Sequence, residues 1–518
     1  MLDRGEFVVE RGVTPPLSMV AAVLASEFEV VHEPPRSVAR TWLDTFDWRL
    51  FRAGLTLEHL EGTGSAELVL STVAGRQVAR SPANGLTWPA RVNGSTPAGV
   101  AQRLAPVLGV RALLPVARTT ATLTGLRMLN RDEKTVVRAV VEERTVLSPA
   151  AGRLAPRVIL APVRGYDRQA KLALRLLRHT AGIARVGATE LDEALAAAAR
   201  RPGDYPGMVE VTLSASATAG SALASVLVHV LDVLEANVDG VVRDLDTEFL
   251  HDLRIAVRRT RSGLTLAGDA LPDGMAELFA GEFRWLGHLS TQVRDLDAGL
   301  EGLDAAVLEF GPAERGALEP FRRYLERRRT AAFPELVAGL RSPRFTELVT
   351  SWRTALADLP LLPVTGERTA AQLATARISR GYHRILRPGK AITPTSPAED
   401  LHELRKRCKE LRYVLEFFAS LHPPVAHRAM IKELKSLQDC LGRFQDSQIQ
   451  REAITSHTEQ MAGESSVAPT TLDAMEQLAA RLATQQHLAR HEFAGRFKRF
   501  ASPKTIGLLM ALAEPPPG

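Results

Sequence analysis

Cysteine is scarce in this sequence, with only Cys408 and Cys440 among 518 residues. Two cysteines are too few for a framework of disulfide bonds, and they lack the paired spacing of cysteine metal ligands. A disulfide-stabilised secreted fold and a cysteine-based metal site are therefore not expected. The chain is instead predicted to fold in a reducing, intracellular compartment.

Long hydrophobic runs are also lacking. The N-terminus shows no basic segment followed by an apolar one, which a secretory signal would need. The most apolar run, residues 222–234, is interrupted by His229 and Asp232, and it falls short of the ~20 residues that span a membrane. We therefore expect a soluble cytoplasmic protein with no membrane partner.

Most of the chain has no large excess of positive over negative charge. The formal net charge is +6, and residues 209–518 are almost balanced. Proteins that coat nucleic acids need many Lys and Arg, and binders of single strands add aromatic platforms. Aromatic residues make up only 5% of the chain, and Tyr413, Phe417 and Phe418 are expected in a core. We therefore expect no specific nucleic-acid partner, and any anion site in this half must be a local cluster.

What the chain does contain is typical of globular domains, with 45% hydrophobic and 24% charged residues. In residues 1–170, short β-prone segments alternate with Gly and Pro turns, which predicts an antiparallel sheet or barrel. The expected strands cover 7–9, 55–57, 67–73, 135–141 and 158–163, and helices are expected over 16–28, 169–179 and 189–200. Thr189 is expected to cap the last of these helices before Glu190. Residues 201–207 are rich in Gly and Pro, which indicates a domain boundary.

From residue 214 onward, apolar residues recur at intervals of three and four, which predicts helices packed on helices. Breaks are expected near 271–274, 359–365, 387–397 and 462–469. The predicted fold class is α+β with several domains. An antiparallel β domain over 1–205 is followed by an all-α domain over 209–510.

An internal repeat runs through the helical half at an offset of 151 residues. It aligns His251, Arg254, Arg258 and Arg261 with His402, Arg405, Lys409 and Arg412. The same offset pairs Leu264 with Leu415, Glu282 with Glu433, Arg284 with Lys435, Leu286 with Leu437, and Asp295 with Asp446. A shared register of this length predicts two copies of one helical-bundle unit, 214–358 and 367–505. We expect an approximate twofold axis between them.

Each copy carries a basic stripe. Positions i, i+3, i+7 and i+10 lie on one face of a helix, so one His and three cations align in each copy. Like charges at this spacing repel one another, and they need an anionic counterpart. That counterpart is either a set of the protein's own carboxylates, which would make the stripe a solvated or ion-paired face, or a ligand with regularly spaced phosphates. His251 and His402 either cap or pack at helix starts, or they contact the ligand.

These stripes, together with residues 293–295 and 434–446, resemble the CHAD domain, the conserved-histidine α-helical domain. The resemblance covers roughly residues 214–500. It implies two four-helix units around a basic channel that binds inorganic polyphosphate, and association with polyphosphate granules in bacteria. Carried onto this sequence, the implied phosphate contacts are His251, Arg254, Arg258 and Arg261 in copy one, and His402, Arg405, Lys406, Lys409 and Arg412 in copy two. Arg284 and Lys435 are further candidates through the repeat.

Residues 41–57, TWLDTFDWRLFRAGLTL, resemble the CYTH or triphosphate tunnel family. That resemblance implies an antiparallel β-barrel with a tunnel in which basic side chains hold a triphosphate and carboxylates hold divalent metal. A CYTH domain followed by a CHAD domain is also a familiar order, which supports both resemblances.

The catalytic residues of the tunnel family are largely replaced in this chain. The Glu-x-Glu-x-Lys signature aligns with Val8, Glu10 and Gly12, so one acid remains. The expected basic positions hold Glu58, Leu60 and Val69 instead. Arg118, Arg127, Arg138 and Glu142 could rebuild a site but are expected to be exposed. Metal-assisted phosphoryl hydrolysis needs clamped ions, so we expect a degenerate domain without catalytic residues or a metal site.

The prediction is therefore an inorganic polyphosphate-binding protein that uses no cofactor, with phosphate contacts from the duplicated helices. One alternative is a metal-dependent triphosphate or polyphosphate hydrolase in the N-terminal domain, which would use magnesium or manganese. Two others are a metal-binding helical module and a nucleic-acid reader. The metal-binding module is disfavoured because His251 and His402 lack a clustered ligand at i+3 or i+4 and because the surrounding cations oppose a metal ion. Unperturbed histidines titrate near pH 6.5, so mild acid is expected to tighten anion binding.

Overall fold

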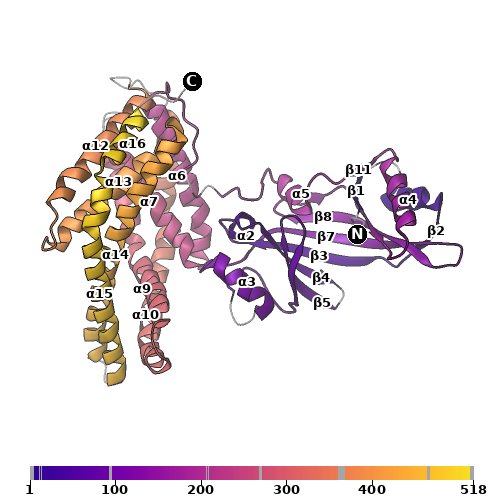
Figure 1. Cartoon of the computed structure of the whole chain (residues 1–518), viewed down its shortest axis with the longest axis horizontal. Coiled ribbons are helices and arrows are strands. Elements are labelled where there is room, and N and C mark those ends of the chain that lie inside the picture. Colours follow the sequence, from indigo (N-terminus) through magenta and orange to yellow (C-terminus); the bar gives the residue numbers. More distant parts are fainter. Residues whose placement is uncertain are drawn as a thin grey trace. The chain divides into compact units, whose positions relative to one another are not determined.

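The computed structural model describes residues 5–513 apart from 11, 13, 63, 93–95, 206, 208, 268–270, 273, 360–367 and 464–466. The chain divides into two compact units, Met1–Tyr205 and Pro206–Gly518 (Figure 1). The break expected at 359–365 lies almost entirely outside the described residues, and those at 271–274 and 462–469 lie partly outside them.

The first unit is built on one antiparallel sheet, with strand order β11-β1-β10-β8-β7-β3-β4-β5-β6. Strand β2 pairs with β7, and β9 pairs with β8. The strands are β1 Gly5–Val9, β2 Glu29–His32, β3 Arg36–Asp44, β4 Leu55–Gly62, β5 Ser65–Thr72, β6 Gln77–Pro82, β7 Leu114–Leu129, β8 Thr135–Ser148, β9 Gly152–Arg153, β10 Arg157–Pro162 and β11 Ile183–Arg185. The predicted antiparallel sheet is thus confirmed. In the described residues the end strands β11 and β6 do not pair, so the sheet is open where a closed barrel was expected.

Five helices described in this unit cover or flank the sheet. They are α1 Pro16–Ala25, α2 Arg49–Arg52, α3 Ala98–Leu108, α4 Asp167–Arg178 and α5 Glu190–Ala196. Helices α1 and α4 pack against the sheet over one core, whose centre includes Phe7, Val20 and Leu177. Helix α5 begins at the predicted cap, because the Thr189 hydroxyl accepts from the Asp192 backbone and the Asp192 carboxylate accepts from Thr189.

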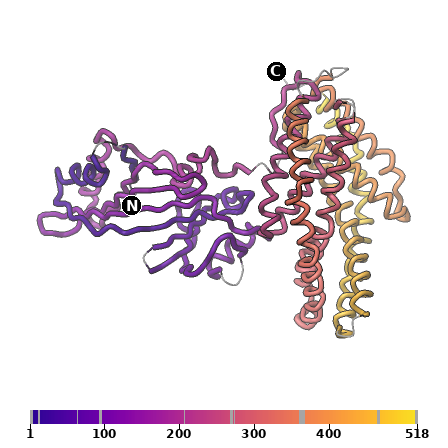
Figure 2. Tube along the Cα trace, turned by 180° about the vertical axis from the view of Figure 1, so that it is seen from behind, coloured from indigo at the N-terminus to yellow at the C-terminus, as the bar shows by residue number. Residues whose placement is uncertain are grey.

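The second unit is all-helical in its described residues, as predicted. Its helices are α6 Ala219–Val242, α7 Thr247–Ala267, α8 Met275–Leu289, α9 Thr291–Val307, α10 Pro312–Leu340, α11 Pro343–Asp358, α12 Ala370–Ala391, α13 Ala398–Phe417, η3 Ala419–Leu421, α14 Pro424–Ala462, α15 Pro469–Phe500 and α16 Pro503–Ala513. Helices α9 and α10, and likewise α14 and α15, form two hairpins that extend in the same direction (Figure 2).

One described helix, α6, is long and apolar enough to cross a membrane by length and composition. Most of its apolar window, 61%, is buried inside the unit. Leu223, Leu227 and Leu234 are fully buried on it. We therefore read α6 as a core helix of the bundle.

The repeat is visible in the helix positions and in one pair of hydrogen bonds. Helices α6 and α12 begin 151 residues apart, and so do α7 and α13. Thr218 and Thr369, equivalent in the repeat, form an antiparallel bridge. The Ala219 backbone donates to the Arg368 carbonyl at 2.9 Å, and the Ala370 backbone donates to the Ala217 carbonyl at 2.8 Å. Reciprocal contacts of this kind are what a twofold axis produces.

The two copies differ in one respect. In the first, α8 and α9 are separate helices that meet at the buried Ser290. In the second, the corresponding segment is the continuous helix α14. The copies therefore share their arrangement without being identical.

Candidate anion-binding site

Helices α7 and α13 carry the two predicted stripes, and they contact one another. Each buries an apolar face, which includes Leu253 and Val257 on α7 and Leu404 and Leu411 on α13. The cations lie on the remaining faces, where they are half-buried or exposed. Two pockets open where these helices meet.

The first pocket, of about 380 Å³, is called here the α12-side pocket. Five predicted site residues line it, namely Arg258, Arg261, Arg284, Lys406 and Lys409. The second, of about 630 Å³, is called the α14-side pocket, and its predicted residues are His251, Arg258, Arg405, Lys409 and Arg412. Arg258 and Lys409, which are equivalent in the repeat, line both pockets. The two basic stripes therefore converge.

Three predicted residues lie outside the lining of both pockets. The Arg254 guanidinium points to the junction of α8 and α9, where Nη1 donates to the Gly287 carbonyl at 2.9 Å and to the Ser290 hydroxyl at 2.8 Å. His402 is half-buried and Lys435 is exposed on α14, and neither lines a pocket. The geometry assigns Arg254 a role in holding the helix junction, which differs from the predicted phosphate contact.

The cations of the α14-side pocket are largely paired with carboxylates. Arg405 pairs with Asp446 at 2.9 Å, and Arg412 pairs with Glu416 at 2.7 Å. The buried Arg259 also reaches Glu416, at 2.9 Å. On this side, the protein's own carboxylates neutralise the stripe, which is one of the two alternatives that the sequence left open.

The cations of the α12-side pocket are mostly unpaired. Within the described residues, no ion pair joins Arg258, Arg261, Arg284 or Lys409 to a carboxylate, although Lys406 pairs with Glu403 at 2.5 Å. The Nε atom of Arg258 is buried, and it has no hydrogen-bond partner among the described residues. An unneutralised cluster of this kind suits an anionic ligand.

Burial and like charges change two titratable groups at the site. Burial, with the nearby cations Arg405 and Arg258, lowers the pKa of Lys409 to about 8. Burial, with the nearby Arg294, lowers the pKa of His251 to about 4. The value of 6.5 applies to an unperturbed histidine, and His251 does not meet this condition, so its imidazole is neutral at neutral pH.

The sequence analysis missed three arginines that line the α12-side pocket, Arg377, Arg380 and Arg384 on α12. Their positions i, i+3 and i+7 repeat the spacing of the recognised stripes. The signal was therefore present in the sequence, but the segment lies outside the aligned stripes of the repeat.

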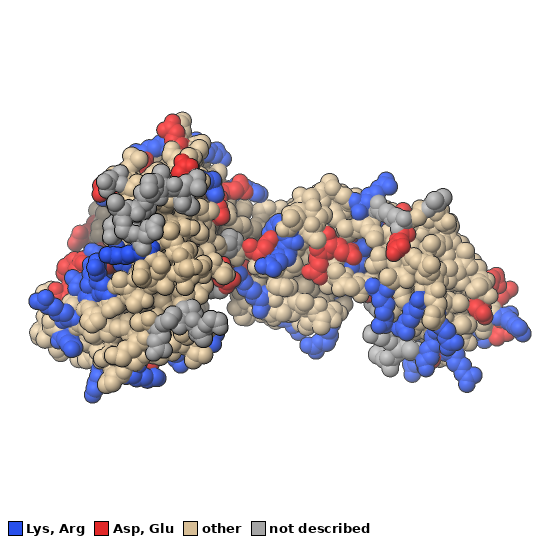
Figure 3. Space-filling model, turned by 90° about the horizontal axis from the view of Figure 1, so that it is seen from above, with Lys and Arg blue, Asp and Glu red and all other residues tan. Residues whose placement is uncertain are grey.

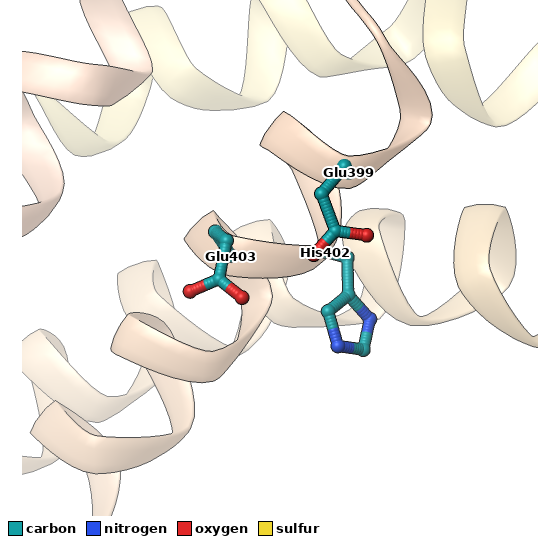
Figure 4. A group of neighbouring side chains, drawn as sticks. All are labelled: Glu399, His402 and Glu403. Carbon is teal, nitrogen blue, oxygen red and sulfur yellow. The ribbon is translucent and has the colours of Figure 1, made fainter.

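Glu399, His402 and Glu403 lie near the start of α13, with one ligand atom from each within 4.8 Å of the others (Figure 4). Two oxygens and a nitrogen are donors that a divalent metal accepts. Glu403 already pairs with Lys406, however, and Glu399 is exposed. We assign no ion to this group.

The N-terminal sheet encloses an ion-pair network. Arg40 of β3 pairs with Glu142 of β8 at 2.8 Å and with Glu190 of α5 at 2.5 Å. Arg144 and Arg157 pair with Glu193 of α5 at 2.7 and 3.1 Å. The cations inside the sheet are thus neutralised by the protein's own carboxylates.

The positions of the tunnel-family signature offer no cluster of metal ligands among the described residues. Glu10 is exposed after β1, and Val69 is buried on β5. Burial raises the pKa of Glu58, which lies near Arg40. Arg118 and Arg138 are exposed as expected, and Arg127 is half-buried. The expectation for Glu142 is wrong, because it is buried in the network with Arg40.

Charged side chains on the surface are grouped in patches separated by wide uncharged areas, on the face seen in Figure 3. A surface of this kind fits the near-balanced charge of the sequence, and it leaves the basic pockets as local features.

Comparison with known proteins matches the CHAD domain model to residues 225–455. A plant CHAD domain from Ricinus communis is similar at 25% identity and a TM-score of 0.47, over 55% of this chain and 94% of that one. PptA from Streptomyces chartreusis is similar at 20% identity and a TM-score of 0.41, over 54% of this chain and 100% of that one.

HpAC1 of Hippeastrum, described with a dominant triphosphatase activity, is similar at 12% identity and a TM-score of 0.24, over 39% of this chain and 98% of that one. A search of the curated proteins finds no match. The match to the family model covers both basic stripes and both helices that carry them. The helical unit of this chain therefore contains a CHAD domain, over residues 225–455.

Proposed function

We propose that this protein binds inorganic polyphosphate where α7 and α13 meet. One observation carries the proposal, namely that Arg258 and Lys409, equivalent in the repeat, line both basic pockets. Neither forms an ion pair within the described residues. A linear anion with one charge per phosphate satisfies such a cluster, with Arg supplying forked contacts and Lys a point charge.

Polyphosphate fits the site better than a nucleic acid does. Of the aromatic residues near the pockets, Phe417 is fully buried and Tyr413 is half-buried. Stacking of bases needs an exposed ring face, whereas a condensed phosphate chain needs only cations. Binding is expected to weaken steeply as salt increases.

The test is a titration of the full-length protein with long-chain polyphosphate. Hydrogen bonds to charged groups contribute about 1.5–3 kcal/mol each, so Arg258→Ala/Lys409→Ala is expected to lower affinity by at least about 100-fold. The matched control, Arg323→Ala/Arg353→Ala, removes two exposed cations that lie outside both pockets. It should change affinity by less than about twofold.

Equal affinity of the Arg258→Ala/Lys409→Ala variant and wild type would overturn the proposal. Competition by DNA or RNA as strong as that by polyphosphate would replace it with a nucleic-acid reader. In cells, the proposal includes association with polyphosphate granules, which the same variant should lose when it is imaged as a fluorescent fusion.

A further inference from the structure

Helix α12 brings a third basic stripe to the site. Arg377, Arg380 and Arg384 line the α12-side pocket, while Tyr382 and Ile385 of the same helix are buried in the core. Arg380 and Arg384 are exposed. The helix therefore presents its guanidinium groups to the pocket and anchors itself by its apolar face.

A close approach of two helices places this stripe beside α13. Gly381 lies between Arg380 and Arg384, and a Cβ atom at Gly381 would come within 3.1 Å of Leu411 of α13. Such a short distance leaves little room for any other side chain at this position. The arginines on either side of Gly381 are thereby held next to Lys409 and Lys406 of α13, which line the same pocket.

The first copy of the repeat has no counterpart of this stripe. The offset of 151 aligns the three arginines with Val226, His229 and Val233 of α6. Val226 and Val233 are buried in the core. The α12 arginines therefore have no charged equivalents on α6 apart from the position of His229, and the repeat relates only part of the lining of the two pockets.

The resulting difference in charge is large. Eight Arg and Lys residues line the α12-side pocket with one carboxylate, Glu410. Six line the α14-side pocket with three carboxylates, Glu416, Asp439 and Asp446. Glu410 pairs with Arg384 at 3.3 Å, and both side chains are about half exposed. Exposed pairs of this kind contribute little and exchange readily for a stronger partner.

We infer that the phosphate chain occupies the α12-side pocket and that Arg380 and Arg384 of α12, with Arg377 beside them, are binding residues for it. This inference rests on the proposed function. The ligand contacts Arg258 and Lys409 from the α12 side. The carboxylates of the α14-side pocket repel a polyanion from that pocket. The site is thus one-sided despite the repeat.

Two double variants of equal net charge test the inference. Arg380→Ala/Arg384→Ala removes two cations from the α12 side. Arg412→Ala/Arg443→Ala removes two from the α14 side, where the freed carboxylates Glu416 and Glu492 each keep a second arginine partner. Affinity for long-chain polyphosphate is measured by titration at fixed salt, and folding of each variant is checked by circular dichroism.

We expect the α12-side variant to lose at least tenfold in affinity and the α14-side variant less than threefold. Arg380→Lys/Arg384→Lys should recover part of the loss, because Lys keeps the charge but not the fork. Equal losses of affinity in the two variants would overturn the inference that the phosphate chain binds on the α12 side.

A third variant separates this inference from the proposed function. If Arg258→Ala/Lys409→Ala abolishes binding while Arg380→Ala/Arg384→Ala does not weaken it, the inference fails and the proposed function stands. If Arg258→Ala/Lys409→Ala also binds as wild type does, the proposed function itself fails.

Discussion

Arg258 and Lys409 are equivalent residues of two copies, and they come close enough for the charge of one to act on the other. Burial and the neighbouring Arg405 and Arg258 lower the pKa of Lys409 to about 8, while Asp446 acts in the opposite direction. The free site therefore loses one of its cations as the pH rises through about 8. A bound polyanion favours the charged ammonium, so binding takes up a proton in this range.

Affinity for long-chain polyphosphate is accordingly expected to rise by about tenfold as the pH falls from 9 to 7. In Lys409→Arg this dependence should disappear, because a guanidinium stays charged throughout the range. Titrations at a series of pH values and constant ionic strength measure the effect.

His251→Asn is the control for this pH dependence. With its pKa lowered to about 4, His251 is neutral at both ends of the range, so the variant should keep the wild-type profile. A profile that stays steep in Lys409→Arg and becomes flat in His251→Asn would assign the proton to the histidine instead.

Arg254 illustrates what the stripe spacing could not predict. The spacing correctly places Arg254 and Arg258 on one helix, but Arg254 is hydrogen-bonded at the α8–α9 junction whereas Arg258 lines both pockets. A long, flexible side chain can reach groups on several neighbouring helices. Here the Arg254 guanidinium donates hydrogen bonds to carbonyl and hydroxyl groups at the α8–α9 junction. Which cations face a ligand is therefore decided by tertiary contacts that the sequence pattern does not contain.

Helices α6 and α7 pack closely at two glycines, Gly240 of α6 and Gly263 of α7. A Cβ atom at Gly240 would lie 2.1 Å from the ring of Phe249, which is fully buried. Gly240→Ala is therefore expected to destabilise the helical unit by about 1–3 kcal/mol through overpacking. Chemical denaturation or calorimetry of the full chain measures the loss.

Gly281→Ala is the matched substitution within α8. Apart from the neighbouring residues and backbone of α8 itself, no atom of the described structure lies within 4 Å of a Cβ at Gly281. The higher helix propensity of Ala should then stabilise the unit by up to about 1 kcal/mol. A Gly240→Ala variant as stable as wild type would mean that α6 and α7 can move apart at no cost.

The sequence predicted the start of a helix where the local pattern for a helix cap is clear. Thr189 was expected to cap a helix, and it forms a capping box at the start of α5. By contrast, β7 was not expected, although it is the longest strand described. Its buried positions include the small residues Ala117 and Ala121, which weaken the apolar alternation. It lies between β8, which follows it after a short turn, and β3, which is distant in sequence.

The whole chain joins a basic-pocket domain to a sheet whose internal charges are already paired. Full-length protein given tripolyphosphate and magnesium or manganese is expected to release no more phosphate than a heat-inactivated sample does. The physical reason is that hydrolysis needs clamped metal ions, while Glu142, Glu190 and Glu193 are engaged with arginines. Phosphate release that persists in Arg258→Ala/Lys409→Ala would contradict this prediction and assign a hydrolase to the first unit.

The reciprocal hydrogen bonds beside Thr218 and Thr369 bear on how this molecule arose. Two identical protomers that meet on an axis make each contact twice, once in each direction, and a gene fusion preserves both within one polypeptide. The bridge is the arrangement that such a fusion would leave. The difference in charge between α12 and α6 requires a single fused chain, because two protomers of one homodimer carry the same residues at equivalent positions.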